Sequence, residues 1–256
     1  AALALAVMLV LQFLWLADLE RASSIAMRAT QRKLAEGLAK EVAYFHKSLA
    51  DKALSVHPTY FAPRRELALA KALEQRYAPG MRRLFAVSLA SKDPLLLFPP
   101  PADESDEVTR EVIAIWAACS PWTLLAKKGD GVVTATARVD ERDPAHRIVV
   151  RPVTDDASRM IGLVGMVLDE AHLRAEVLPK AIQSALPRDG EGGKLAVWVC
   201  DERWNTVVGD EPGCGPKSAT RVQFPFAFTN WTISLHDRRA TPEASARRSF
   251  SFNVTL

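Results

Sequence analysis

AALALAVMLVLQFLWLADLE, residues 1–20, is the stretch that decides how the rest of the chain is organised. Gln12 is the only clearly polar side chain before Asp18. A helix that crosses a membrane needs about 20 apolar residues, with a lower limit of about 17. We expect residues 1–17 to be a transmembrane helix, and a truncated one, because the apolar run begins at residue 1 with no flanking charge.

Two other interpretations of this run stay open. A secretory signal peptide would carry a basic start and a cleavage site between small residues, and LADLERASS, which follows Trp15, contains no Ala-x-Ala pattern. A buried core helix would be shorter or amphipathic. Trp15 lies just before Asp18, where an interfacial aromatic residue belongs, and this favours the membrane span.

Residues 18–57 predict a long juxtamembrane helix that continues from the span. Between Leu19 and His57 there is no proline and a single glycine, Gly37. Apolar residues recur every three or four positions and form one helical stripe: Leu34, Leu38, Val42, Phe45, Leu49, Ala53 and Val56. Pro58 is expected to end the helix. The arrangement would hold a domain away from a bilayer, although an ordinary core helix would show the same stripe.

Residues 58–188 predict a membrane-distal module that contains a sheet. We expect a helix over 63–77, two short strands within 84–98, and a helix that carries Val108 to Cys119 and stops before Pro121. Three β-rich segments then follow with short turns between them, which predicts an antiparallel meander: residues 131–139, 146–153 and 159–168. A helix is expected directly after the third strand.

Residues 189–240 predict a smaller, membrane-proximal β module. DGEGG at 189–193 is expected to be a flexible joint, and about four short strands follow it. Strands this short cannot build a large core, so we expect the module to lean on the long first helix. Residues 241–256 begin with a helix start and turn apolar, and we expect them to enter a second, truncated membrane span. The fold class is therefore α+β.

The overall composition excludes several classes of protein. Hydrophobic residues make up 48% and charged residues 25% of the chain, which is ordinary for a folded protein. The net charge is only +3, from 33 basic and 30 acidic residues, and no basic stripe is interleaved with aromatic residues. We therefore expect no nucleic-acid partner.

The three cysteines leave one disulfide open. Cys119 lies alone in a helical stretch, whereas Cys200 and Cys214 flank a loop, and three cysteines do not fit a four-ligand zinc site. A Cys200–Cys214 bridge can form if this part of the chain lies outside the cytoplasm. It would contribute about 3 kcal/mol in the chain-entropy model. The alternative is two free thiols.

No motif predicts catalysis, a metal site or a cofactor. The five histidines are scattered, and the Asp169-Glu170-x-His172 pattern lacks the paired i, i+4 spacing of a metal-binding helix. Its acidic residues are better explained as favourable charges at a helix N-terminus. GEGGK at 190–194 lacks the spacing of a phosphate-binding loop. We expect this fragment not to be an enzyme.

Two segments resemble the sensor region of bacterial two-component sensor histidine kinases. They are GLVGMVLDEAHLRAEVLPKAI, residues 162–182, followed by AVWVCDERWNTVVGD, and WTISLHDRRATPEASARRSFSFNVTL, residues 231–256. The resemblance implies a PAS-like or Cache-like sheet and an inner-membrane protein with residues 18–248 on the periplasmic side. We also expect a homodimer, because long helices of this kind usually pack in pairs. The resemblance also implies a kinase core after residue 256. The input domain of a chemoreceptor or a cyclic-nucleotide cyclase, or a singly anchored binding protein or enzyme, is the alternative.

The resemblance also directs attention to one place for a ligand. In PAS-like sheets a ligand lies between the central strands and the helices over them. The residues expected there are Trp116 and Trp122 from the helix side, and His146 and Arg151 from the second meander strand. Arg151 could bind a carboxylate with two hydrogen bonds. Ordinary core packing of both tryptophans and an exposed Arg151 is the alternative, and the signal sensed could also be a protein.

Overall fold

The computed structural model describes residues 2–89, 91, 94–128, 134–186, 195–209, 214 and 221–237, without the side chains of residues 2–6, 9, 127, 128, 236 and 237. The chain forms two compact units. One contains Val42–Leu178 and Pro225–Thr229 and is called the five-stranded unit after its sheet. The remainder of the chain forms the other, which is called the four-stranded unit.

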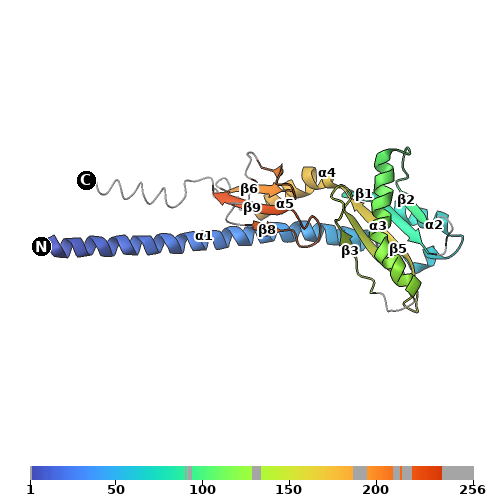
Figure 1. Ribbon diagram of the computed structural model, residues 1–256, viewed down its shortest axis with the longest axis horizontal. Coiled ribbons are helices and arrows are strands. Elements are labelled where there is room, and N and C mark those ends of the chain that lie inside the picture. The colour runs from blue at the N-terminus through green and yellow to red at the C-terminus, as the bar shows by residue number, and fades with distance from the viewer. Residues whose placement is uncertain are drawn as a thin grey trace. The chain divides into compact units, whose positions relative to one another are not determined.

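Helix α1 (Ala2–Ala53) is a single helix of 52 residues (Figure 1). It includes most of the long helix expected over residues 18–57, but it ends at Ala53, a few residues before the proline that was expected to stop it. The predicted apolar stripe is largely buried by the rest of the chain, since Leu38, Val42 and Ala53 are at most 2% exposed. The stripe is therefore a core-facing surface.

The two membrane spans stay predictions. In the part of the chain that the structure describes, no helix has a stretch both long and apolar enough to cross a membrane. The span expected at residues 1–17 lies partly outside the described residues and side chains, and the segment expected at 241–256 lies wholly outside them.

The sheet of the five-stranded unit is antiparallel throughout, with the strand order β2-β1-β5-β4-β3. The strands are β1 (Met81–Ser88), β2 (Leu95–Phe98), β3 (Arg138–Asp140), β4 (Ile148–Thr154) and β5 (Met160–Leu168). The sequence predicts both the β1–β2 pair and the β3–β4–β5 meander. Their junction is the pairing of β1 with β5, which joins strands far apart in the chain.

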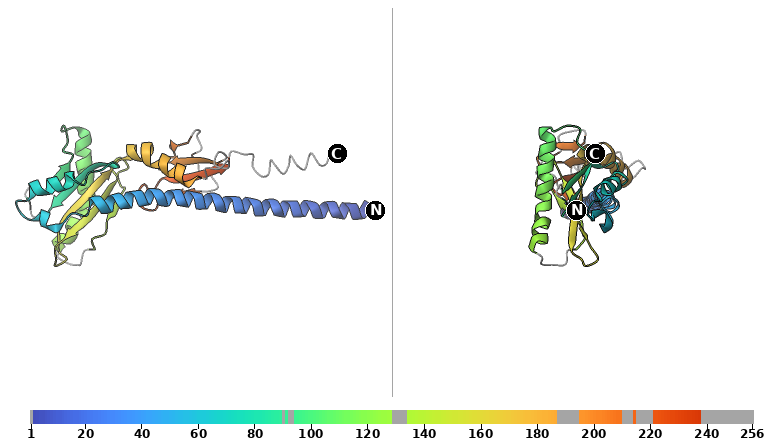
Figure 2. Two further views of the ribbon diagram at one scale, coloured as in Figure 1. Left: turned by 180° about the vertical axis from the view of Figure 1, so that it is seen from behind. Right: turned by 90° about the vertical axis from the view of Figure 1, so that its right-hand side faces the viewer.

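Helices cover both faces of this sheet (Figures 1 and 2). Helix α3 (Asp106–Lys128) lies on one face, and the end of α1, the 3₁₀ turn η1 (Pro58–Phe61) and α2 (Glu66–Glu74) lie on the other. Because successive side chains of a strand point to opposite faces, each central strand supplies both layers of core. This explains why β4 and β5 are almost continuously buried.

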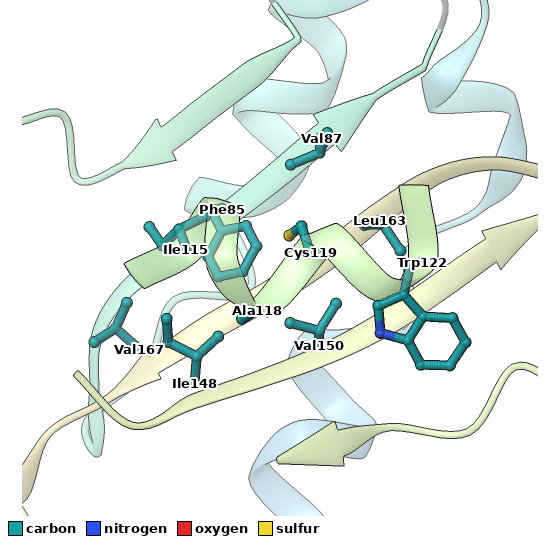
Figure 3. Close-up of a cluster of buried hydrophobic side chains, with 10 residues drawn as sticks. All are labelled: Phe85, Val87, Ile115, Ala118, Cys119, Trp122, Ile148, Val150, Leu163 and Val167. Carbon is teal, nitrogen blue, oxygen red and sulfur yellow. The ribbon is translucent and has the colours of Figure 1, made fainter. Parts of the chain in front are cut away.

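The core beneath α3 is a compact apolar cluster (Figure 3). It contains Phe85, Val87, Ile115, Ala118, Cys119, Trp122, Ile148, Val150, Leu163 and Val167. Phe85 lies opposite Gly165 in the β1–β5 register. A Cβ atom on Gly165 would stand 2.2 Å from Cζ of Phe85 and 2.7 Å from the carbonyl oxygen of Val149, so only glycine leaves room for the ring.

The expected end of α3 before Pro121 is wrong, because the helix continues through Pro121 to Lys128. Proline has no N–H and normally leaves the carbonyl four residues earlier without its helical donor. That carbonyl belongs to Ala117, and Nη2 of Arg142 donates to it over 2.6 Å. A side chain distant in sequence thus replaces the missing backbone donor, which the local pattern does not reveal.

Two further expected elements are shorter than predicted. The helix expected over 63–77 is α2, Glu66–Glu74, with η1 before it. The strand expected over 131–139 is only β3, Arg138–Asp140; residues 134–137 form no strand, and 131–133 lie outside the described residues. Alternation of β-branched residues marks strand propensity, but a strand also needs a partner, and β4 pairs only with Arg138–Asp140 on this side.

The helical segment after β5 is continuous but changes its winding. It consists of α4 (Glu170–His172), the π-helical turn η2 (Leu173–Val177) and α5 (Leu178–Ala185). Asp169 caps its start, since Oδ1 accepts from the backbone N–H of His172 over 3.0 Å. The acidic residues at 169 and 170 therefore belong to a helix start, as the sequence favours.

The four-stranded unit contains a second antiparallel sheet, in the order β7-β6-β9-β8. Its strands are β6 (Leu195–Cys200), β7 (Thr206–Val208), β8 (Arg221–Gln223) and β9 (Thr232–Asp237). They are the four short strands expected from the sequence. Trp231 and Ile233 are fully buried in this unit. The joint expected at 189–193 lies outside the described residues.

Candidate functional site

Trp122 is part of the hydrophobic core. It is 6% exposed and belongs to the cluster beneath α3, where Figure 3 shows it at the end of the group near Leu163. The guanidinium of Arg138 lies 5.0 Å from the centre of its ring, as expected for a cation–π contact. The structure thus assigns Trp122 to packing.

Trp116 and His146 have different surroundings. Trp116 lies on the same helix but is 37% exposed and is not part of the cluster. His146 precedes β4 and is not part of the strand on which it was expected. The Nδ1–H of its buried ring donates to Oδ2 of Asp143 over 2.7 Å, within the turn that leads into β4.

Arg151 lies on the other face of the sheet. Its neighbour Val150 faces α3, so the alternation of the strand turns Arg151 toward α1. Its Nη1 donates to Oγ of Ser55 over 3.1 Å and lies 3.9 Å from Oδ1 of Asp51. Trp122 and Arg151 therefore occupy opposite layers, and the four expected residues do not converge on one pocket. Alternation along β4 puts Val150 and Arg151 on opposite faces, but the sequence does not show which helix covers each face.

A cleft of about 790 Å³ is present elsewhere in the five-stranded unit. It opens between the chain from η1 to α2 and the end of the β1–β2 pair. Its apolar lining comprises Phe61, Ala62, Pro63, Leu69, Pro94, Leu95 and Leu96. Its polar lining comprises Tyr60, Arg64, Glu66, Ser88 and Ser91. Pockets for small molecules commonly have about 300–1,000 Å³ and this mixture of apolar walls and a few polar groups.

Phe61 fixes the position of the η1 wall. It is buried, and Gly162 of β5 lies against its ring, since a Cβ atom on Gly162 would stand 2.4 Å from two ring carbons. The missing side chain on β5 lets η1 approach the sheet closely. A glycine on the central strand thus determines where one side of the cleft lies.

Arg64 is held in an unusual backbone conformation beside the cleft. Its φ is 65°, in the left-handed region that non-glycine residues seldom adopt. The N–H of Arg65 donates to the carbonyl of Ala62 over 3.3 Å, and Pro63 stands between them. Proline followed by a residue with positive φ fits a type II turn, where glycine or asparagine is usual. This turn places Arg64, an exposed residue, in the lining of the cleft.

The charges of the cleft are of both signs. Arg64 and Glu66 both line it, two positions apart, and both side chains are exposed. Hydroxyl groups of Tyr60, Ser88 and Ser91 add neutral hydrogen-bonding groups. The arrangement can bind a small molecule that carries an acidic group and an apolar part. Over the described ranges, no three side chains of His, Cys, Asp or Glu gather where they could bind a metal ion.

The cysteines are divided between a bridge and a buried thiol. Cys200 and Cys214 form a disulfide within the four-stranded unit, with their Cα atoms 5.7 Å apart. Cys119 is a buried free thiol, and burial, assisted by the negative charge of Asp140, raises its pKa to about 12. A thiol this hard to ionise is a poor nucleophile.

The sequence did not identify the cleft residues. The signal that could have found them is the Pro63-Arg64 pair, since proline predicts a turn and arginine is an unusual residue to follow it there. Ser88, Ser91 and Leu95 carry no such signal. They reach the cleft only because β1 and β2 pair and bring the end of the hairpin beside η1.

Comparisons with known proteins identify no family. No family model matches the chain, and no curated protein matches it either. Among solved structures, the ligand-binding domain of the Pseudomonas aeruginosa PAO1 amino-acid chemoreceptor PctC, in complex with GABA, overlays with a TM-score of 0.44 at 13% identity. The overlay covers 83% of this chain and 99% of that one. The ligand-binding domain of PctB from the same organism, in complex with L-arginine, gives a TM-score of 0.42 at 12% identity, covering 87% and 91%. TM-scores below 0.5 do not establish a shared fold.

Proposed function

We propose that this chain is an extracytoplasmic input domain that senses a small molecule in the cleft beside Arg64. The observation that carries the proposal is the cleft itself, which has the volume and mixed lining of a small-molecule site. A strained arginine at its edge adds a cation that a turn holds in place. The opening apolar run and the 52-residue helix over Ala2–Ala53 support attachment to a membrane.

The chemistry of the lining suggests the class of ligand. A guanidinium binds carboxylates with two parallel hydrogen bonds, and Glu66 could accept from an ammonium group on the same ligand. The apolar walls, which include Leu69 and Leu95, would contact an aliphatic part. We therefore propose a small organic acid, with amino acids as the first compounds to test.

Binding is tested by calorimetric titration of the protein with a panel of amino acids and short carboxylic acids, including GABA and L-arginine. A compound that binds should lose at least about tenfold in affinity in Arg64→Ala, because a charge-assisted hydrogen bond is lost. Arg65→Ala is the matched control, since the neighbouring arginine does not line the cleft. Equal affinities of both variants, or no binding across the panel, would contradict the proposed ligand class.

Periplasmic location is a separate part of the proposal. Alkaline phosphatase is active only outside the cytoplasm, so a fusion within the exposed turn near Asp156 should be active in a bacterial host. A fusion before residue 1 should be inactive. The reverse pattern would exclude an extracytoplasmic input domain.

A sensor histidine kinase is the output that we propose, on the sequence resemblance of residues 162–182 and 231–256. The input domain of a chemoreceptor or of a cyclic-nucleotide cyclase is the alternative, since the same input layout serves each. The coding sequence beyond residue 256 distinguishes them. A phosphoacceptor histidine followed by a nucleotide-binding domain would support the kinase, and any other output domain would exclude it.

We also propose that the chain forms a homodimer, and that the two chains pair through a face of α1 other than its apolar stripe. Leu38 and Val42 are covered by their own chain, so they are poor positions for crosslinks between two chains. Tyr44 lies on the other side of the helix and is 74% exposed. Tyr44→Cys should give a disulfide-linked dimer in membranes if the exposed face of α1 pairs, and Leu38→Cys is the control that should not.

A further inference from the structure

Residues Pro225–Thr229, here called the strap, have an unusual place in the chain. They connect β8 to β9, both of which belong to the four-stranded unit. The strap itself belongs to the five-stranded unit. Phe224 alone separates the end of β8 from the strap, and Asn230 and Trp231 separate the strap from the start of β9.

Apolar contacts anchor the middle of the strap. Ala227 and Phe228 are 2% and 1% exposed. The ring of Phe228 lies 5.5 Å from the ring of His46 on α1, and the guanidinium of Arg147 lies 4.6 Å from its centre. A buried aromatic ring with a cation over its face holds the strap by both packing and charge.

Glu141 fixes the backbone of the strap. Its carboxylate accepts hydrogen bonds from the backbone N–H groups of Phe228 and Thr229, the latter over 2.9 Å, and from the hydroxyl of Thr229. The Glu141 side chain is only 11% exposed. Hydrogen bonds to a charged acceptor are stronger than neutral ones, and water competes little at a site this buried.

Arg147 extends this network to the other end of the connection between β3 and β4. Its Nε lies 3.9 Å from Oε1 of Glu141, and its Nη1 donates to Oε2 of Glu170 over 2.8 Å and to the carbonyl of Pro144 over 2.6 Å. Glu141 follows β3 directly, and Arg147 directly precedes β4. Both ends of the β3–β4 connection therefore hold the strap.

The strap also contains backbone strain. Phe228 has a φ of 58°, which is unfavourable for a bulky residue and persists only where surrounding contacts enforce it. The three hydrogen bonds to Glu141 and the buried ring supply that enforcement. If the Glu141 contacts were lost, the strap would gain by relaxing away from this conformation.

We propose that Glu141 is a positioning residue that couples the β3–β4 connection to strands β8 and β9 through the strap. A displacement of this connection is passed to the backbone of Phe228 and Thr229, and from there along the chain into both strands. The coupling goes beyond ligand binding in the cleft, and it holds whatever the ligand is.

Hydrogen–deuterium exchange of the whole chain, read by mass spectrometry, tests the coupling. Glu141→Ala should raise exchange in the strap by at least about tenfold, because the amides of Phe228 and Thr229 lose a charged acceptor. Exchange in β8 and β9 should rise by at least about threefold, while exchange in β4 and β5 stays unchanged. The matched control is Asp155→Ala, since Asp155 likewise accepts from two backbone N–H groups and one side chain, but in the β4–β5 turn.

A second perturbation separates coupling from simple loosening. Arg142 lies within the β3–β4 connection, binds Asp140 and the Ala117 carbonyl, and is mostly exposed. Arg142→Ala should change exchange in β9 by at least about twofold in the native background and should have no effect there in Glu141→Ala. Such a pattern is the signature of transmission through Glu141.

Two outcomes would overturn the proposal. In the first, Glu141→Ala raises exchange in the strap while exchange in β8 and β9 stays unchanged. In the second, Arg142→Ala changes exchange in β9 equally in the native and the Glu141→Ala backgrounds. If Glu141→Ala unfolds the five-stranded unit, as judged by full exchange of β4 and β5, Thr229→Val decides instead. It removes only the hydroxyl donor and should reproduce the strap and strand changes on a smaller scale; their absence would overturn the proposal equally.

Discussion

The two sheets are stabilised in different ways. The central strands of the five-stranded unit have eight, seven and nine residues, and both faces of the sheet are covered by helices. The strands of the four-stranded unit have six, three, three and six residues, and a disulfide joins Cys200 to Cys214. Short strands bury little apolar area, so a covalent link contributes what packing does not. The following predictions test that contrast.

The largest effect is expected from Phe85→Ala in the core beneath α3. Phe85 is fully buried, and removing a buried phenylalanine costs about 3–5 kcal/mol in the free energy of unfolding. Chemical denaturation, monitored by hydrogen exchange in β1 and β5, measures the loss of stability. The contrast between the units breaks down if the loss is below about 1 kcal/mol, since the packed cluster would then not be what stabilises the larger sheet.

Removal of the disulfide should be next in size and should affect only the four-stranded unit. The double variant Cys200→Ala, Cys214→Ala loses about 3 kcal/mol, because the bridge closes a loop with a sequence separation of 14. Calorimetry should show the transition of this unit move to lower temperature while that of the other stays. Cys119→Ala is the control for altering a cysteine without breaking a bridge. A shift of both transitions together would mean that the units unfold as one.

Acid should destabilise the five-stranded unit through His46. Burial, opposed by its hydrogen bond to the Val42 carbonyl and assisted by His172, lowers the pKa of His46 from 6.5 to about 4. Between about pH 6.5 and pH 4, His46 is therefore protonated in the unfolded chain but neutral in the folded chain. Stability is fully present above pH 6.5 and falls by about 2 kcal/mol on going to pH 5.

Denaturation at a series of pH values measures this slope. His46→Phe should flatten it between pH 6.5 and 5, because the ring that replaces the imidazole cannot bind a proton. A slope that persists in His46→Phe would assign the acid sensitivity to another group.

The smallest effect is a gain, from Gly37→Ala in α1. A Cβ atom on Gly37 would meet nothing within 4 Å, so alanine adds helix propensity of about 1 kcal/mol without a clash. The same substitution at Gly165 should destabilise the chain, because the added Cβ meets Phe85 and the Val149 backbone. The melting temperatures of the two variants should move in opposite directions. A shift in the same direction would show that the space around each glycine does not determine the effect of the substitution.

The local pattern predicted most elements, and its errors have identifiable causes. Periodicity identified α1, the β3–β4–β5 meander and the four short strands because each depends on neighbouring residues. Pro121 was read as a helix end because its replacement donor, Arg142, lies in a loop that only the fold brings near. The expected ligand residues failed to converge because Trp122 and Arg151 face opposite layers of a sheet that is covered on both sides.

By itself the sequence determined the α+β class, the long helix and the order of the strands along the chain, since hydrophobic spacing and turn residues act over a few positions. It left the Cys200–Cys214 bridge open. Tertiary structure alone decided that β1 pairs with β5, that the cleft forms between Arg64 and the β1–β2 pair, and that the strap reaches Glu141. These features depend on contacts between residues far apart in the chain, and those contacts exist only once the five-stranded unit has folded.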